Sequence, residues 1–241
     1  MSLAFNQSEY DQRLDKTRRA MSQHGVDVLL VTDPSNMAWL TGYDGWSFYV
    51  HQGVLVPSSG EPIWFGREQD AQGARRTVWM SHDHIFGYPD HYVQSVERHP
   101  MDYLASLLRD WGWQDKKIGV EMDNYYFSAA AYIALQKELP AASLADTTGL
   151  VNWQRSIKSP QEITYMKMAG VIVERMHTMI HERVKPGLRK NVLVADIFHT
   201  AIRGTEEYGG DYAAIVPLLP TGIDASAPHL TWNDRPFESD A

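Results

Sequence analysis

Two histidines lie four residues apart in a segment with helical periodicity, which is the spacing of one class of zinc ligands. They are His177 and His181, and the zinc motif of this spacing has a glutamate directly after the first histidine, where it acts as a general base. Here that residue is Thr178. A structural pair, one histidine beside the core and one in solvent, is therefore the better interpretation.

A second histidine-rich stretch contains His82, His84, His91 and His99. On a strand, His82 and His84 would point to the same side, an arrangement compatible with a metal ligand pair. Histidines at the surface or at a subunit contact are the commoner case for such a pattern. The sequence therefore predicts no metal site in this chain.

The segment from Gly42 to Gln52 is the strongest candidate for ligand binding. Two glycines bracket its start, and it reads Gly-Tyr-Asp-Gly-Trp-Ser-Phe-Tyr-Val-His-Gln. Tyrosine and tryptophan supply rigid contact area with a hydrogen-bonding tip, and their ring faces attract cations. We predict that the tyrosine and tryptophan side chains of this segment enclose a small ligand that is charged or amphoteric. The alternative is the edge of an ordinary hydrophobic hairpin.

A loop of small residues, Thr221 to Pro228, leads directly to His229. The glycine and alanines in this loop leave room for a ligand, and the proline restricts the backbone before the histidine. A histidine presented in this way could act as an acid or a base. From these residues alone, a surface histidine without a function remains the alternative.

The elements that position these residues change character near residue 150. Before it, short apolar runs alternate with helical patterns, which predicts an α/β fold with helices packed on a sheet. The expected strands are 26–31, 48–56, 62–65, 118–121 and 142–145, and the expected helices are 8–24, 34–41, 68–80, 96–111 and 129–139.

After residue 150 the pattern becomes that of long amphipathic helices. We expect helices over 160–184 and 192–205, separated by Pro186-Gly187, and strand and loop structure from Asp211 onward. The predicted domains are 1–153 and 154–241.

Composition excludes several classes of function. Hydrophobic residues make up 44% of the 241, so a sizeable core is expected. The formal net charge of −8 and the absence of basic runs argue against nucleic-acid binding. The sequence has no cysteine, and it has neither a secretory signal pattern nor an apolar run of membrane-spanning length. The expected location is the cytoplasm.

Three segments resemble the creatinase and Xaa-Pro peptidase (pita-bread, M24-type) family. Residues 155–163, Arg-Ser-Ile-Lys-Ser-Pro-Gln-Glu-Ile, resemble the opening of its catalytic domain, and Val184-Lys-Pro-Gly187 matches the break after the first helix. Gly222 to His229 resembles its glycine-to-Pro-His element. The resemblance implies a creatinase-like N-terminal domain, with a mixed sheet flanked by helices, followed by the first part of an α+β pita-bread domain.

Within this family, the segment Leu40 to Gln52 and the Gly66-Arg67-Glu68 turn are most similar to the ectoine hydrolase subgroup. The resemblance implies a hydrolase that acts on a non-peptide C–N bond and opens the cyclic amidine of ectoine to an N-acetylated diaminobutyrate. His229 is then expected to be catalytic. The alternatives are an Xaa-Pro dipeptidase or aminopeptidase, and a non-catalytic pita-bread binding module.

The resemblance also bears on metal binding and on the oligomeric state. In the peptidases, all five ligands of a two-metal site follow the Pro-His element, and this sequence ends at Ala241 before such positions. We therefore expect a C-terminally truncated chain that is inactive alone, and the cofactor is left undetermined. Family members form homodimers in which the N-terminal domain reaches the neighbouring active site, so Trp46, Tyr49 and His51 are expected to act there.

Overall fold

The computed structural model describes residues 3–239, which form two compact units that divide after Ile157. The boundary expected between residues 153 and 154 lies inside a helix, α6 (Leu150–Ser156), which belongs to the N-terminal unit. Because α6 packs on the first helix of that unit, the chain leaves the unit only after the helix ends.

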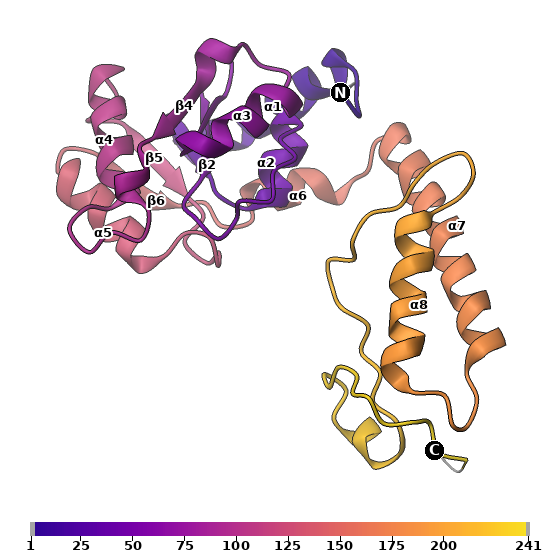
Figure 1. The fold of residues 1–241 in the computed structure, drawn as a ribbon. Helices are drawn as coiled ribbons and strands as arrows, with labels where there is room; N and C mark the ends of the chain where they lie inside the picture. Colours follow the sequence, from indigo (N-terminus) through magenta and orange to yellow (C-terminus); the bar gives the residue numbers. More distant parts are fainter. Residues whose placement is uncertain (1–2, 240–241) are drawn as a thin grey trace. The chain divides into compact units, whose positions relative to one another are not determined.

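A six-stranded mixed sheet forms the centre of the N-terminal unit (Figure 1). The strand order is β4-β3-β2-β1-β5-β6, with β1/β2 and β2/β3 antiparallel and the other neighbouring pairs parallel. The prediction of a mixed sheet flanked by helices is confirmed. The strands are β1 (Val28–Val31), β2 (Gly53–Pro57), β3 (Ile63–Arg67), β4 (Ile85–Tyr88), β5 (Lys117–Val120) and β6 (Ser143–Asp146).

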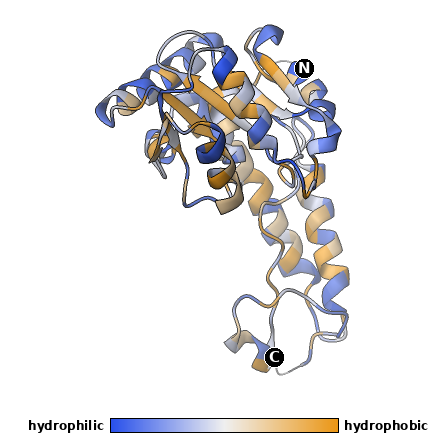
Figure 2. Ribbon diagram, turned by 90° about the vertical axis from the view of Figure 1, so that its left-hand side faces the viewer, coloured by the Kyte–Doolittle hydropathy of each residue, from blue (hydrophilic) through white to orange (hydrophobic). Residues whose placement is uncertain are grey.

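Helices cover both faces of the sheet because both faces are apolar. Leu29 and Val31 of β1 point into one core, and Val28 and Leu30 point into the other, as the alternation of side chains along a strand requires. The first core includes residues of α1 (Gln7–Gln23), α2 (Pro34–Thr41), α3 (Glu68–Thr77) and α6, and the second includes residues of α4 (Pro100–Asp110) and α5 (Ala129–Glu138). Figure 2 shows hydrophobic strands, with helices around them that carry both hydrophilic and hydrophobic residues.

Local signals fix where most of these helices begin. Asp33 and Pro34 start α2 as predicted, with the Asp33 side chain accepting a hydrogen bond from Asn36 N at 2.9 Å. His99 caps the helix α4 in the same way and is followed by Pro100.

Three expectations for this unit need correction. The strand expected from Phe48 begins only at Gly53, because residues 44–52 form a loop. The strand β4 and the helix α6 were not expected. His82–His84 form a 3₁₀ turn (η1) capped by Ser81, so these histidines do not alternate along a strand, and His84 pairs instead with Glu61 at 3.1 Å. A second 3₁₀ turn, η2, spans Asp90–Tyr92.

The second unit contains the long helices α7 (Pro160–Arg183) and α8 (Lys190–Arg203), which pack together, and the 3₁₀ turn η3 (Gly222–Ser226). Ser159 and Glu162 form a capping box at the start of α7. The strand structure expected after Asp211 is not found up to residue 239, where the backbone is loop except for η3 and one bridge between Arg189 and Pro236. The backbone around Pro236 pairs only briefly with the segment before α8, through bonds such as Phe237 N to Leu188 O at 2.9 Å, which is too short a pairing to form a strand.

None of the helices in the described part of the chain is long and apolar enough to cross a membrane.

Candidate functional site

A buried tyrosine anchors the loop between α2 and β2 to the core. Gly42 ends α2 with a φ of 79°, a left-handed conformation that favours glycine. The next residue, Tyr43, turns into the core, and its hydroxyl donates to Gln52 Oε1 at 2.9 Å, which ties the two ends of the loop together. A Cβ at Gly45 would lie 2.2 Å from the Tyr43 hydroxyl oxygen, so the backbone passes directly over this anchor.

The same loop, residues 44–52, carries a cluster of exposed aromatic rings and is called the aromatic loop below. Trp46 is 62% exposed and Tyr49 is 58% exposed, although both are large and apolar. The centroid of the Trp46 ring lies 5.0 Å from that of Phe48 and 6.1 Å from that of Tyr49. The ring centroids of Phe48 and Tyr126 are 6.2 Å apart. The rings support one another while their faces stay open, an arrangement suited to stacking on a planar or cationic ligand.

His51 lies at the end of this loop and lines a cavity of about 230 Å³ together with Tyr49. Its ring centroid is 4.5 Å from that of His99, the residue that caps α4. The His51 backbone carbonyl accepts a hydrogen bond from the Tyr88 hydroxyl at 2.8 Å. The structure therefore brings the three predicted binding residues together, since Trp46 contacts Tyr49 and Tyr49 shares the cavity with His51.

Both histidines of this cavity are held in their neutral form at neutral pH. Burial, reinforced by the neighbouring His99, lowers the pKa of His51 to about 4. Burial also lowers the pKa of His99, although the charge of Asp102 opposes this effect. Neutral imidazoles each offer one N–H donor and one acceptor, so the pair provides hydrogen bonds without a permanent charge.

The depressed pKa of His51 predicts an acid-sensitive N-terminal unit. His51 binds a proton near pH 6.5 in the unfolded state but only near pH 4 in the folded state. The free energy of unfolding is therefore unaffected by this residue above pH 6.5 and falls as the pH is lowered from 6.5 toward 4. We expect this residue to account for a loss of roughly 1–3 kcal/mol over that range. Urea unfolding of His51→Gln at pH 7 and pH 4.5 should show a smaller loss than the wild type. The control His181→Gln, an exposed histidine of the second unit, should keep the wild-type loss; equal losses for wild type and H51Q would contradict the prediction.

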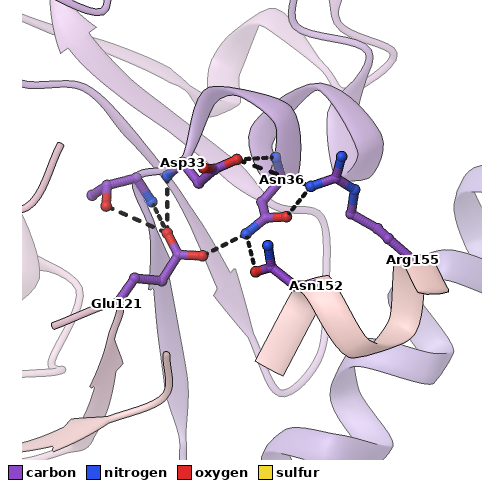
Figure 3. A network of polar contacts seen from close by, with 6 residues as sticks. Asp33, Asn36, Glu121, Asn152 and Arg155 are labelled. Carbon is purple, nitrogen blue, oxygen red and sulfur yellow. Dashed lines mark hydrogen bonds and ion pairs between the residues drawn. The ribbon is translucent and has the colours of Figure 1, made fainter. Parts of the chain in front are cut away.

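A buried carboxylate organises the carboxyl ends of the parallel strands β1 and β5 (Figure 3). Glu121 accepts hydrogen bonds from Thr32 N at 2.7 Å, from Asp33 N at 2.9 Å and from Asn36 Nδ2 at 2.6 Å. Burial raises the pKa of Glu121, while the bonds from Asp33, Thr32 and Asn36 act in the opposite direction. The carboxylate thus joins the two strand ends to the start of α2.

Asn36 connects this carboxylate to the helix α6 (Figure 3). Its amide nitrogen also donates to Asn152 Oδ1 at 3.0 Å, and its amide oxygen accepts from Arg155 Nη1 at 2.6 Å. Arg155 also lies 4.0 Å from Asp33. The network fixes the helix that ends the N-terminal unit. Asn36 and Glu121 are almost completely buried, so their hydrogen bonds are shielded from solvent.

His229 lies in the second unit, in the loop after η3, where its side chain is exposed. The loop with Trp46, Tyr49 and His51 belongs to the other unit. Among residues 3–239, no group of three or more His, Asp or Glu side chains is arranged to hold a metal ion, so these residues by themselves do not fit a metal centre.

Sequence reasoning missed the network around Glu121 and the position of His99 in the wall of the cavity beside His51. Asn36 and Glu121 are 85 residues apart, and Asn36 and Arg155 are 119 apart, so no local pattern links them. The sequence did contain a signal for His99 as a helix cap. A capping box typically has a hydrogen-bond acceptor before the helix and an acidic residue at the third helical position, and here proline follows His99 and Asp102 holds that position.

Comparison with known proteins now identifies the family. Residues 13–157 match the model of the creatinase/prolidase N-terminal domain. The chain belongs to the creatinase/prolidase family. Among its relatives, the ectoine hydrolase of Halomonas elongata is 59% identical and an uncharacterized hydrolase/peptidase of Sinorhizobium fredii is 41% identical. These alignments cover 98% and 99% of the chain but 61% of each relative. The chain thus spans less than two thirds of their length.

The creatinase/prolidase fold extends over both units. A crystal structure of prolidase from Thermococcus sibiricus superimposes with a TM-score of 0.76, at 18% sequence identity, over 95% of this chain and 58% of that chain. At this identity the match concerns the fold alone. It confirms the expected architecture of a creatinase-like N-terminal domain followed by part of a pita-bread domain.

Proposed function

We propose that the protein is a hydrolase that opens the cyclic amidine of ectoine and releases an N-acetylated diaminobutyrate. The observation that carries this proposal is the 59% identity to an ectoine hydrolase along 98% of the chain, which includes the whole aromatic loop. Peptidase activity is the alternative within the family, and the matched prolidase structure is only 18% identical.

The reaction needs a positioned water and a proton donor. Water adds to the amidine carbon, the bond between that carbon and one ring nitrogen breaks, and the departing nitrogen takes a proton while the other nitrogen stays in the new amide. We assign the proton transfer to His229, because the Gly222–His229 element resembles the active-site element of the family. Its exposed position in a loop of small residues leaves room for a substrate beside the ring.

The aromatic loop supplies what a cationic, planar substrate requires. An amidinium carries a delocalised positive charge, and the open faces of Trp46 and Tyr49 attract such a charge. We propose that the enzyme works as a cytoplasmic homodimer in which this loop reaches the active site of the neighbouring subunit. The exposure of these rings supports that assignment, since large apolar side chains are seldom left in solvent without a partner.

Product analysis of the full-length gene product tests the proposal. Ectoine and an Xaa-Pro dipeptide are supplied separately, each with a chelator or with added Mn²⁺, and substrate and product are followed by proton NMR. We expect conversion of ectoine to the acetylated product and negligible dipeptide cleavage. Cleavage of the dipeptide without turnover of ectoine would make the protein a peptidase. Turnover of neither, with ectoine still bound, would make it a binding module.

A further inference from the structure

The cavity beside His51 is lined by hydrogen-bond donors and has no acidic residue in its wall. It has a volume of about 230 Å³, and its polar lining comes from three tyrosines and from His51, His99, Arg98, Gln94 and Ser95. None of its described lining residues is aspartate or glutamate, in a chain whose formal net charge is −8. A local excess of donors in an acidic protein points to an anionic ligand.

The donors of this cavity are fixed by the local structure. His99 Nδ1 accepts a hydrogen bond from Met101 N at 3.1 Å, so in the neutral ring the proton must be on Nε2. The His99 backbone N–H is used by Asp102 at 2.8 Å, which holds the capping residue in place. For His51, no hydrogen bond within the described residues involves a ring nitrogen. Its N–H is therefore available to a ligand.

The positive charge in the cavity wall suits a ligand that carries a single negative charge. Arg98 is the one permanent cation in its described lining, and it is partly engaged by Glu97 at 3.2 Å. The amino end of α4, at Pro100, adds a partial positive charge. The two histidines are neutral at pH 7, so a dianion would remain undercompensated. Val50, Val93 and the tyrosine rings provide an apolar wall for a short hydrocarbon body.

The backbone of the cavity wall provides an independent observation. Gln94 has a φ of 50°, and it is the one non-glycine residue of the described chain in this left-handed region. Such a conformation is unfavourable for a side chain of this size and is concentrated at ligand sites, where the surrounding structure imposes it. The strained residue lies in the wall of the cavity that has the unused donors.

We propose that this cavity binds a small monocarboxylate with a short apolar body, held by His51, His99 and Arg98. All of these residues belong to the N-terminal unit, so the site does not depend on the proposed hydrolase activity. The carboxylate could belong to ectoine or to a separate small acid, and the experiment below distinguishes these sources.

Ligand-observed saturation-transfer NMR on the full-length protein at pH 7 tests this site, with propionate, its neutral isostere propionamide, inorganic phosphate and ectoine as probes. We expect saturable binding of propionate, at least tenfold weaker binding of propionamide, and phosphate binding no tighter than that of propionate. Displacement of propionate by ectoine would identify the substrate as the source of the carboxylate. Binding of propionate without displacement would identify a separate acid.

Variants locate the site. Arg98→Gln and His51→Gln should each weaken propionate binding about tenfold, with unchanged circular dichroism. Arg203→Gln, which removes an exposed arginine of α8, and His229→Ala, which concerns the proposed catalytic residue, should leave propionate binding unchanged. Equal binding of propionate and propionamide, tighter binding of phosphate, or wild-type affinity in both R98Q and H51Q would overturn the proposal.

Discussion

Replacing His229 by alanine in the full-length gene product is expected to lower ectoine turnover by about 10²–10⁴-fold, the usual loss for a general acid or base. The change removes the group assigned to carry the proton to the departing nitrogen. Stability should hardly change, because the side chain is exposed in a loop. Initial rates from proton NMR, with urea unfolding on the same samples, measure both effects.

A matched variant and a mixing experiment sharpen this test. His181→Ala removes another exposed histidine of the same unit and should leave turnover within about twofold of the wild type. If the aromatic loop acts in the neighbouring subunit, mixed dimers of Trp46→Ala and His229→Ala subunits contain one intact site, and random mixing should restore about a quarter of wild-type activity. Near wild-type turnover by H229A would remove His229 from the mechanism, and no recovery on mixing would argue for a loop that acts within its own subunit.

Truncating Asn36 to alanine is expected to destabilise the N-terminal unit by about 2–4 kcal/mol. The change removes a donor at 2.6 Å from the buried carboxylate of Glu121 and an acceptor at 2.6 Å from Arg155, and solvent cannot replace them at a site with 0% exposure. Urea unfolding followed by tryptophan fluorescence reports on this unit, because every tryptophan except Trp232 belongs to it.

The control for this prediction is Gln136→Ala, which removes an exposed amide from the helix α5. Its effect should stay within about 0.5 kcal/mol, since a surface substitution away from a polar network seldom changes stability. An additional variant, Asn36→Asp, places a second carboxylate beside Glu121, and its destabilisation should become smaller as the pH is lowered and the carboxylates are protonated. Equal stability of N36A and Q136A would show that the network contributes nothing to the fold.

The sequence by itself determined the elements whose signals are local. The helices α2 and α7 begin at Pro34 and Pro160 as predicted, since proline at the first turn acts on the adjacent backbone. The apolar runs of β1 and β5 predicted buried strands, and the two apolar faces of such strands require helices on both sides. The segments resembling the creatinase and Xaa-Pro peptidase family gave the family, which the match over residues 13–157 confirms.

Tertiary structure decided the features that depend on residues distant in the chain. The loop before β2 could not be distinguished from strand, because its path is set by Tyr43, which enters the core and bonds to Gln52. His51 and His99 meet only because β2 and α4 pack in one unit, and burial there makes both rings neutral. The hydrogen bonds that join Asn36 to Glu121 and Arg155 likewise form only after the sheet and α6 have assembled. The periodicity and spacing of the sequence therefore do not predict them.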